Sequence, residues 1–225
     1  TIETIVEGAS IVFGACARYR LPVLLTSTSE VYGKSEALPF TEDSDSIIGP
    51  PVYRRWAYAS AKALDEFLAL AYWHQIKLPV VLVRLFNTVG PRQIGQYGMV
   101  VPRLIRQARA GQPLTVYGDG NQSRCFCHVD DAVKALVMLL DEPSCAGELF
   151  NVGSTEQVSI NDLAKRIISL TGSSSEIQHV PYEEAYGNGF EDMRHRVPSL
   201  EKVKKQIGFD PQHDLSAIIQ TIVAH

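Results

Sequence analysis

Two side chains have the types and the spacing needed for proton transfer: Tyr58 and Lys62, at the start of the helix pattern YASAKALDEFLALAYW. Residues at positions i and i+4 share one face of a helix, so the phenol and the ammonium point the same way. A nearby ammonium favours the phenolate and lowers the pKa of a tyrosine below its ordinary value of about 10. We therefore expect Tyr58 to exchange a proton with a substrate hydroxyl near neutral pH.

A cluster of oxygen-bearing side chains, Ser27-Thr28-Ser29-Glu30, follows an apolar strand upstream of this helix. Ligands of open α/β sheets bind outside the carboxyl ends of the strands, which is where these residues fall. We expect Thr28 to bind the same substrate oxygen as Tyr58, and we count Ser29 and Glu30 as catalytic candidates. The alternative for Glu30 is a strand-end carboxylate in a surface salt bridge.

Helices and strands alternate in the first part of the chain. A helix is expected over 2–19, a strand over 21–28, a helix over 58–76 and a strand over 79–86. Both strands are almost continuously apolar, which is typical of parallel strands covered on both faces. The order predicts an α/β fold with a parallel sheet.

Shorter elements follow a loop at 92–98. The capping signals are Asp130 or Asp131 before one helix, and Ser159 with Asp162 before another. The expected helices are 100–110, 132–141, 160–171, and two near 199–207 and 214–223. The expected strands are 114–118, 123–129 and 147–153.

The composition excludes several classes of function. The 225 residues are 45% hydrophobic and 20% charged, with a net charge of −4 and no basic run, which argues against a nucleic-acid partner. The sequence contains no stretch of about eighteen apolar residues, which a membrane-spanning helix would require. The four cysteines are irregularly spaced, so we expect free thiols in a reducing cytoplasm and no metal site.

Several motifs together resemble the extended short-chain dehydrogenase/reductases, in the group of NAD-dependent nucleotide-sugar epimerases, dehydratases and decarboxylases. In chain order these motifs are STSEVYG (27–33), YASAK (58–62), RLFNTVGPR (84–92), PLTVYGDGNQSRCFCHVDDAV (113–133), ELFNVGS (148–154) and DMRHRVPSLEKV (192–203). The resemblance implies bound NAD, a UDP- or dTDP-sugar substrate, and chemistry that begins by oxidising the sugar at C4.

The resemblance also implies a division into domains. Residues 1–90 and 119–145 are expected to form the C-terminal part of a Rossmann-like NAD-binding domain, and 91–118 with 146–225 a smaller α/β domain for the nucleotide sugar. No glycine-rich dinucleotide motif occurs in the sequence. We therefore expect an N-terminally truncated fragment whose sheet lacks its first strands, and which alone neither binds NAD tightly nor turns over substrate.

Further site residues follow from the resemblance. Tyr58, Lys62, Thr88 and Arg92 are expected to face the cofactor, with Lys62 on the nicotinamide ribose. The residues expected to contact the nucleotide sugar are Asn87, Val101, Tyr117, Arg124 and Arg196. Arg194 competes with Arg196 for its role, and the spacing does not decide between them.

The reaction branch is narrowed by a few residues. STSEVYG and Arg55-Trp56 resemble the UDP-glucuronate decarboxylases, our first expectation. Met99 departs from that branch, which typically carries arginine there, so a UDP-glucose or UDP-glucuronate 4-epimerase is the alternative. A 4,6-dehydratase or a non-catalytic nucleotide-sugar binder comes third. The family commonly dimerises through helices that correspond to 2–19 and 58–76, so we expect a homodimer.

Overall fold

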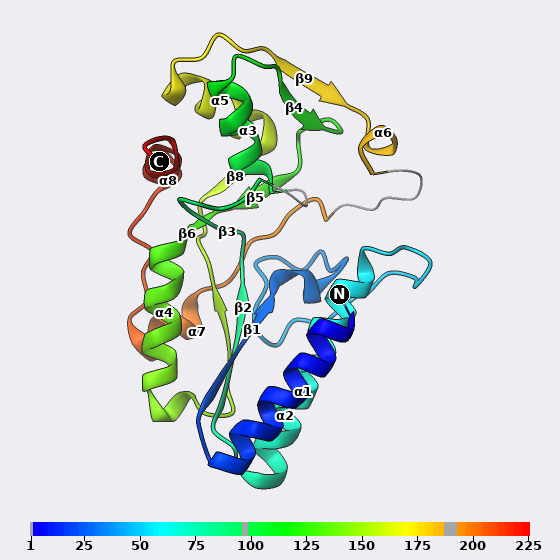
Figure 1. The fold of residues 1–225 in the computed structure, drawn as a ribbon, viewed down its shortest axis with the longest axis vertical. Helices are drawn as coiled ribbons and strands as arrows, with labels where there is room; N and C mark the ends of the chain where they lie inside the picture. Colours follow the sequence, from blue (N-terminus) through cyan, green and yellow to red (C-terminus); the bar gives the residue numbers. More distant parts are fainter. Residues whose placement is uncertain (1, 96–98, 187–192) are drawn as a thin grey trace.

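The chain folds into two halves that lie one above the other (Figure 1). The computed structural model describes residues 2–95, 99–186 and 193–225, so residues 96–98 of the expected loop and Asp192 of the last motif lie outside the described part. The lower half in Figure 1 is built around a parallel sheet, and the upper half around three helices with short strand pairs.

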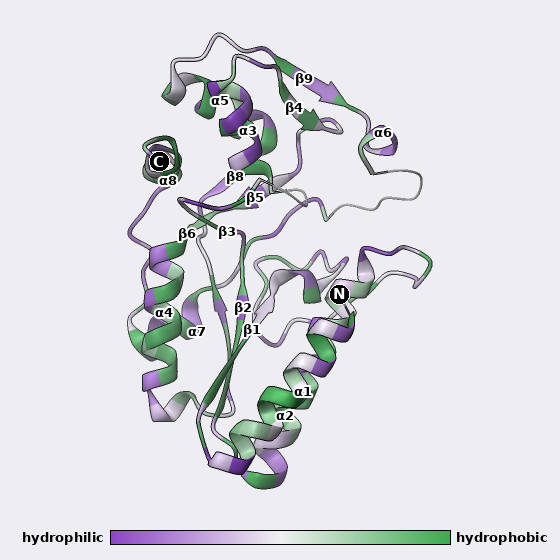
Figure 2. Ribbon diagram, in the orientation of Figure 1, coloured by the Kyte–Doolittle hydropathy of each residue, from purple (hydrophilic) through white to green (hydrophobic). Residues whose placement is uncertain are grey.

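Three parallel strands form the sheet of the lower half, in the order β1-β2-β7. They are β1 (Val23–Thr28), β2 (Val80–Leu85) and β7 (Leu149–Val152). Side chains of β2 alternate between the two faces: Val80 and Leu82 belong to one hydrophobic cluster, and Val81 and Val83 to the other. Figure 2 accordingly colours long stretches of β1 and β2 as hydrophobic.

Helices cover both faces of this sheet. Helices α1 (Ile2–Tyr19) and α2 (Trp56–Ile76) pack together on one face, and α4 (Val129–Asp141) and α7 (Glu201–Ile207) cover the other. The predicted α/β class with a parallel sheet is therefore confirmed.

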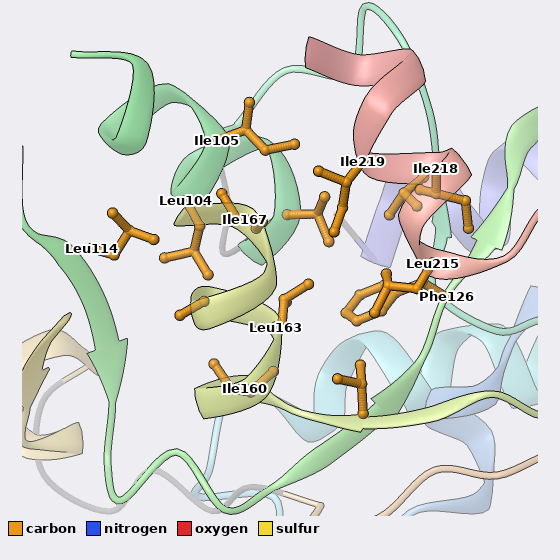
Figure 3. Close-up of a cluster of buried hydrophobic side chains, with 14 of the residues drawn as sticks. Leu104, Ile105, Leu114, Phe126, Ile160, Leu163, Ile167, Leu215, Ile218 and Ile219 are labelled. Atoms are coloured by element: carbon orange, nitrogen blue, oxygen red, sulfur yellow. The ribbon is translucent and has the colours of Figure 1, made fainter. Parts of the chain in front are cut away.

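The upper half is held by a separate apolar core between its three helices, α3 (Val100–Arg109), α5 (Ile160–Thr171) and α8 (Leu215–Val223). Leu104, Leu163 and Ile218 point into this core from one helix each (Figure 3). The strand pairs around it are β4 (Leu114–Tyr117) with β9 (Ile177–Val180), and β5 (Ser123–Cys125) with β8 (Gln157–Ser159); helix α6 (Tyr182–Tyr186) follows β9.

Local signals fix the ends of α5 as expected. The hydroxyl of Ser159 accepts a hydrogen bond from the backbone N–H of Asp162 at 3.0 Å, which confirms the predicted cap. Gly172 ends the helix in the left-handed conformation, with φ of 63°, which a residue without Cβ adopts at little cost.

The single strand expected over 123–129 is wrong, because two strands, β5 and β6 (Cys127–His128), share that segment. Phe126 between them packs into the core of the upper half, whereas Cys127 packs into the core of the lower half. Because these two consecutive side chains enter different hydrophobic cores, the backbone turns between them and the strand is interrupted. Strand β6 then pairs with β3 (Thr88–Val89) at the junction of the halves.

The cap expected for α4 is also wrong. His128 occupies the N-cap, and its Nδ1 accepts from the backbone N–H of Asp130 at 3.2 Å. The carboxylate of Asp131 instead accepts from the backbone N–H groups of Gln212 and His213, both at 3.1 Å. Asp131 therefore ties α4 to the segment that leads into α8.

The domain boundary differs from the predicted division at 146. Strand β7 pairs with β2, and Val203 of α7 packs into the core under the sheet, so both belong with the lower half. Conversely, β5 lies in the upper half, where it pairs with β8. Among the described residues, no helix has both the length and the apolar character needed to cross a bilayer.

Candidate active site

The carboxyl end of β1 carries the first group of site residues. Thr28 has an extended backbone, and its hydroxyl accepts from the backbone N–H of Glu30 at 3.3 Å, which starts a 3-10 turn over Ser29–Tyr32. The turn places the Glu30 side chain in a cavity and buries Ser29, which is 2% exposed. Ser29 does not line that cavity.

Tyr58, in the first turn of α2, lies against this strand end. The Thr28 side chain lies close enough to this phenol to lower its pKa, so the structure brings together the two residues that were expected to share a substrate oxygen. The phenol is partly exposed, at 39%, and lines the cavity.

The expected effect of Lys62 on Tyr58 is wrong for this structure. Burial, and next the negative charge of Glu30, raise the pKa of Tyr58 above its ordinary value, and the nearby Thr28 side chain does not offset them. The Lys62 ammonium instead donates to the backbone carbonyl of Thr26 at 3.1 Å and lies 3.7 Å from the carboxylate of Asp65. The sequence places both groups on one face of the helix but does not show what else the ammonium contacts.

Two arginines hold Glu30. Its carboxylate lies 2.6 Å from the guanidinium of Arg196 and 3.1 Å from that of Arg55. Burial opposes the ionisation of Glu30, but the two cations outweigh it, so the pKa of Glu30 lies below its ordinary value. Glu30 is therefore a carboxylate at neutral pH, and the three side chains together carry one net positive charge.

This cluster forms part of a cavity of about 400 Å³ between the two halves. The predicted site residues that line it are Glu30, Tyr58, Asn87, Thr88, Val101, Tyr117, Arg124 and Arg196. They come from the 3-10 turn after β1, from α2, the loop after β2, strand β3, helix α3, the end of β4, strand β5 and the segment before α7. The choice left open between Arg194 and Arg196 falls on Arg196, because the Arg194 side chain is exposed and only its backbone carbonyl accepts bonds nearby.

Four predicted site residues do not line the cavity. Thr28 contacts Tyr58, Lys62 donates to the backbone carbonyl of Thr26, and Ser29 is buried in the turn. Arg92, with φ of 66°, borders a separate hollow beside Arg106 and Arg109 of α3. Arg92 therefore lies outside this cavity, and its expected contact with the cofactor stays a prediction.

Several lining residues were missed as site residues. Arg55 was noted only as a mark of one family branch. Arg103 lies 4.0 Å from the ring centroid of Tyr117 and donates to the backbone carbonyl of Thr115 at 3.0 Å. Tyr182 packs closely on Gly118, where a Cβ would meet its ring at 2.3 Å. Arg103 follows the apolar Val-Val-Pro run of α3, which offered a local signal, whereas only the fold brings Tyr182 to the cavity.

A buried polar row crosses the sheet just below the site. Ser27, Arg84 and Asn151 are direct neighbours on β1, β2 and β7. Glu66 of α2 accepts two bonds from Arg84, at 3.0 and 2.7 Å, and one from the Ser27 hydroxyl at 2.5 Å. Tyr32 donates to Asn151 at 2.7 Å. The row thus ties α2, which carries Tyr58, to the strand that carries Thr28.

Several known proteins are similar to this chain in sequence or in fold. The chain is 46% identical, over 93% of its length, to a UDP-N-acetyl-alpha-D-glucosaminuronate decarboxylase of Bacillus cytotoxicus. It is 36% identical, over 94% of its length, to UDP-glucuronic acid decarboxylase 1 of Danio rerio. The chain spans 65% of the length of the first relative and 48% of the second.

A solved structure of UDP-glucuronic acid 4-epimerase from Bacillus cereus, in complex with UDP-glucuronic acid and NAD, has the same fold. It superposes with a TM-score of 0.86 at 26% identity, covering 99% of this chain and 67% of that one. The family model described as "NAD dependent epimerase/dehydratase family" matches residues 1–153. On these grounds the chain belongs to the NAD-dependent epimerase/dehydratase family.

Proposed function

We propose that this chain carries the catalytic face of an enzyme that decarboxylates a UDP-linked hexuronate through a 4-keto intermediate, with NAD as cofactor. The observation that carries the proposal is the carboxylate of Glu30, held by Arg55 and Arg196 in the cavity that Tyr58 also lines. Exchange of hydrogen at C4 needs only a hydroxyl and a phenol. A paired carboxylate beside them suits an enzyme that must also break a bond next to C4.

The residues around Tyr58 fit the nicotinamide end of NAD. The Lys62 ammonium has three donors, and one bond to Thr26 leaves donors for the hydroxyls of a ribose. When bound, NAD would supply the acceptor for the hydride that leaves C4 and return that hydride at the end of the reaction.

Tyr58 and Thr28 would act on the substrate oxygen at C4. As the C4–H bond breaks, the phenolate form of Tyr58 would take the proton from that hydroxyl, which turns C4 into a ketone. Because burial and Glu30 raise the pKa of Tyr58 in this structure, this role requires that the positive charge of the bound nicotinamide ring favour the phenolate. The carboxylate on C5 is then in the β-keto position, so the C5–C6 bond breaks with loss of CO2 and its electrons pass to the C4 oxygen. The ketone re-forms when C5 takes up a proton from water, before the hydride returns to C4. Hydrogen bonds from Tyr58 and Thr28 would stabilise the charge on that oxygen.

Charge in the cavity suits a substrate of this kind. The net positive charge of the Glu30–Arg55–Arg196 cluster would favour a sugar carboxylate at the reactive end. Arg103 and Arg124 are positioned for the diphosphate, because a guanidinium donates two parallel hydrogen bonds to phosphate oxygens. Tyr117, under the Arg103 guanidinium, offers an aromatic face for the nucleoside. The two relatives named as decarboxylases support the proposal.

A 4-epimerase of a UDP-sugar is the second candidate. Met99 in the cavity favours it, since the resembled decarboxylases typically carry arginine there. The similarity to the UDP-glucuronic acid 4-epimerase structure also supports it.

Mass spectrometry of the NAD-loaded holoenzyme tests the proposal. After incubation with UDP-glucuronate or UDP-N-acetylglucosaminuronate, loss of CO2 is expected. A product of unchanged mass with inverted C4 would favour the epimerase instead, and loss of water a dehydratase. Tyr58→Phe is expected to lower turnover about 100-fold or more, whereas Tyr19→Phe, at an exposed tyrosine of α1, serves as the matched control. Undiminished turnover in Tyr58→Phe would refute the assignment.

We also propose a homodimer located in the cytoplasm. Phe67 and Leu64 on α2, and Ile11 and Val12 on α1, are 50% exposed or more, which supports an apolar contact between two copies. Two further apolar residues of α2, Leu68 and Tyr72, pack instead against the core of their own chain. The four cysteines are free thiols, which suits a reducing compartment.

A further inference from the structure

One stretch of the cavity lining carries no charge. Thr88, Gln93 and Met99, here called the neutral wall, line the same cavity as the Glu30 cluster and Arg124. The Gln93 amide nitrogen donates to the backbone carbonyl of Thr88 at 3.3 Å and lies 3.7 Å from the sulfur of Met99. These three residues therefore form one continuous surface.

The orientation of the Gln93 amide follows from its neighbours. A carbonyl oxygen and a thioether sulfur are both acceptors, so the side that faces them must be the nitrogen. The oxygen, Oε1, is consequently turned elsewhere, and it is buried without a hydrogen-bond partner. The hydroxyl oxygen of Thr88 is likewise buried without a hydrogen-bond partner. Buried polar atoms are nearly always paired in folded proteins, so two such atoms beside a cavity indicate that a ligand pairs with them.

The two atoms call for complementary partners. Gln93 Oε1 can only accept a hydrogen bond, whereas the Thr88 hydroxyl can donate one. A secondary amide supplies an N–H donor and a carbonyl acceptor on two separate atoms, whereas a hydroxyl must offer both from a single oxygen. Met99 adds an adaptable apolar surface that suits a methyl group.

We propose that the neutral wall binds an acetamido substituent on the sugar, so that the enzyme prefers an N-acetylated UDP-hexuronate to UDP-glucuronate. This inference rests on the proposed function and names the substrate within it. The Gln93 amide oxygen accepts from the acetamido N–H, the Thr88 hydroxyl donates to the acetyl carbonyl, and the Met99 side chain covers the methyl group. Thr88, which the resemblance assigned to the cofactor, thereby contacts the sugar through its hydroxyl.

The test compares kcat/KM of the holoenzyme for UDP-N-acetylglucosaminuronate and UDP-glucuronate. A site that hydrogen-bonds a substituent discriminates against the analogue without it, so we expect a preference of about tenfold or more for the N-acetylated substrate. Gln93→Leu and Met99→Arg should each reduce that preference about fivefold or more, by removing the acceptor and by filling the methyl site with a cation. Ile94→Arg, 69% exposed and outside this cavity, adds the same charge as a control and should keep the preference.

A second measurement separates this inference from the proposed reaction. Calorimetric titration with UDP-N-acetylglucosamine and UDP-glucose, neither of which has a carboxylate to lose, should show tighter binding of the first, and Gln93→Leu should remove the difference. If neither uronate loses CO2 but this difference is found, the proposed function fails and the acetamido site stands. If UDP-glucuronate is decarboxylated at least as well as its N-acetylated analogue, or Gln93→Leu affects both equally, the acetamido site is overturned.

Discussion

Where α2 meets the parallel sheet, buried contacts next to the site join charged and polar groups; where α5 meets α3 and α8, the buried contacts are aliphatic. Glu66 binds Arg84 and Ser27 through atoms 2.5 to 3.0 Å apart. Leu163 and its neighbours in the upper core are buried without polar partners (Figure 3). Charged hydrogen bonds are directional and fix relative orientation, whereas apolar burial is not directional. The polar contacts lie where Tyr58 and Thr28 must meet within hydrogen-bond reach.

This comparison predicts that stability and catalysis are coupled in the lower half and separable in the upper half. The half that contributes the reacting groups depends on a specific geometry, so disturbing it should affect turnover. The half that contributes the nucleotide-side arginines depends mainly on a filled core, so a moderate loss of stability there should leave the geometry of Tyr58 unchanged.

The largest effect is expected from Glu66→Ala. It leaves the buried guanidinium of Arg84 without its partner, and breaking a buried ion pair in this way costs about 3 to 5 kcal/mol. Urea unfolding of the holoenzyme measures this loss. Under conditions in which the variant remains folded, kcat should also fall, because the tie between α2 and β1 is lost. Normal kcat in the folded variant would break the proposed coupling.

Leu163→Ala tests the other side of the comparison. Leu163 is fully buried in the upper core, and truncating a buried leucine costs about 2 to 4 kcal/mol. Thermal unfolding should show a lower midpoint, while kcat at saturating substrate stays near that of the unchanged enzyme. A fall in kcat as large as that of Glu66→Ala would show that the two halves are not separable.

Glu30→Gln probes the charge cluster through pH. The two arginines depress the pKa of Glu30 in the folded chain, so its ionised form stabilises the fold above its unfolded pKa, and this contribution is lost as pH falls through the lower folded value. Glu30→Gln should thus be less stable than the unchanged protein at pH 7, and the difference should shrink as the pH falls below the ordinary glutamate pKa and through the lower folded pKa. Denaturant titrations of both proteins at several pH values measure this difference in the free energy of unfolding. A gap independent of pH would mean that the arginines do not act through the charge of Glu30.

The smallest effect is expected from Ser159→Ala, which removes the hydroxyl that caps α5. Loss of an N-cap costs about 1 kcal/mol, and here it should lower the unfolding free energy without changing kcat. Thr171→Ala, at the other end of the same helix, is a useful comparison, because its hydroxyl donates to carbonyls within the helix rather than caps the N-terminus. A kcat change in Ser159→Ala alone would contradict the separation.

Much of the fold follows from local patterns. The helix expected over 2–19 is α1, and the apolar runs at 21–28 and 79–86 contain β1 and β2, because these segments carry strong periodic or continuous apolar signals. Strands β8 and β9 have three and four residues, too short for a periodic signal, and were not expected. The split at Phe126 was missed because it depends on two cores that the local sequence does not reveal.

The candidate site shows the same division. Motif resemblance identified eight residues that line the cavity. It did not identify Gln93 or Arg103, whose roles depend on contacts with Thr88 and Tyr117. The spacing of Tyr58 and Lys62 led us to expect a lowered pKa for Tyr58, because it shows one cation on the helix and not the burial of the phenol or the neighbouring Glu30.

By itself, the sequence determined which chemical groups are available and on which faces of their helices and strands they lie, because the periodicity of the backbone fixes those directions. Only the tertiary structure decided which groups meet. It paired Glu30 with Arg55 and Arg196, and it turned Lys62 towards Thr26. Burial and the distance between charges set the energies of such pairs, and both arise only when segments far apart in the chain pack together.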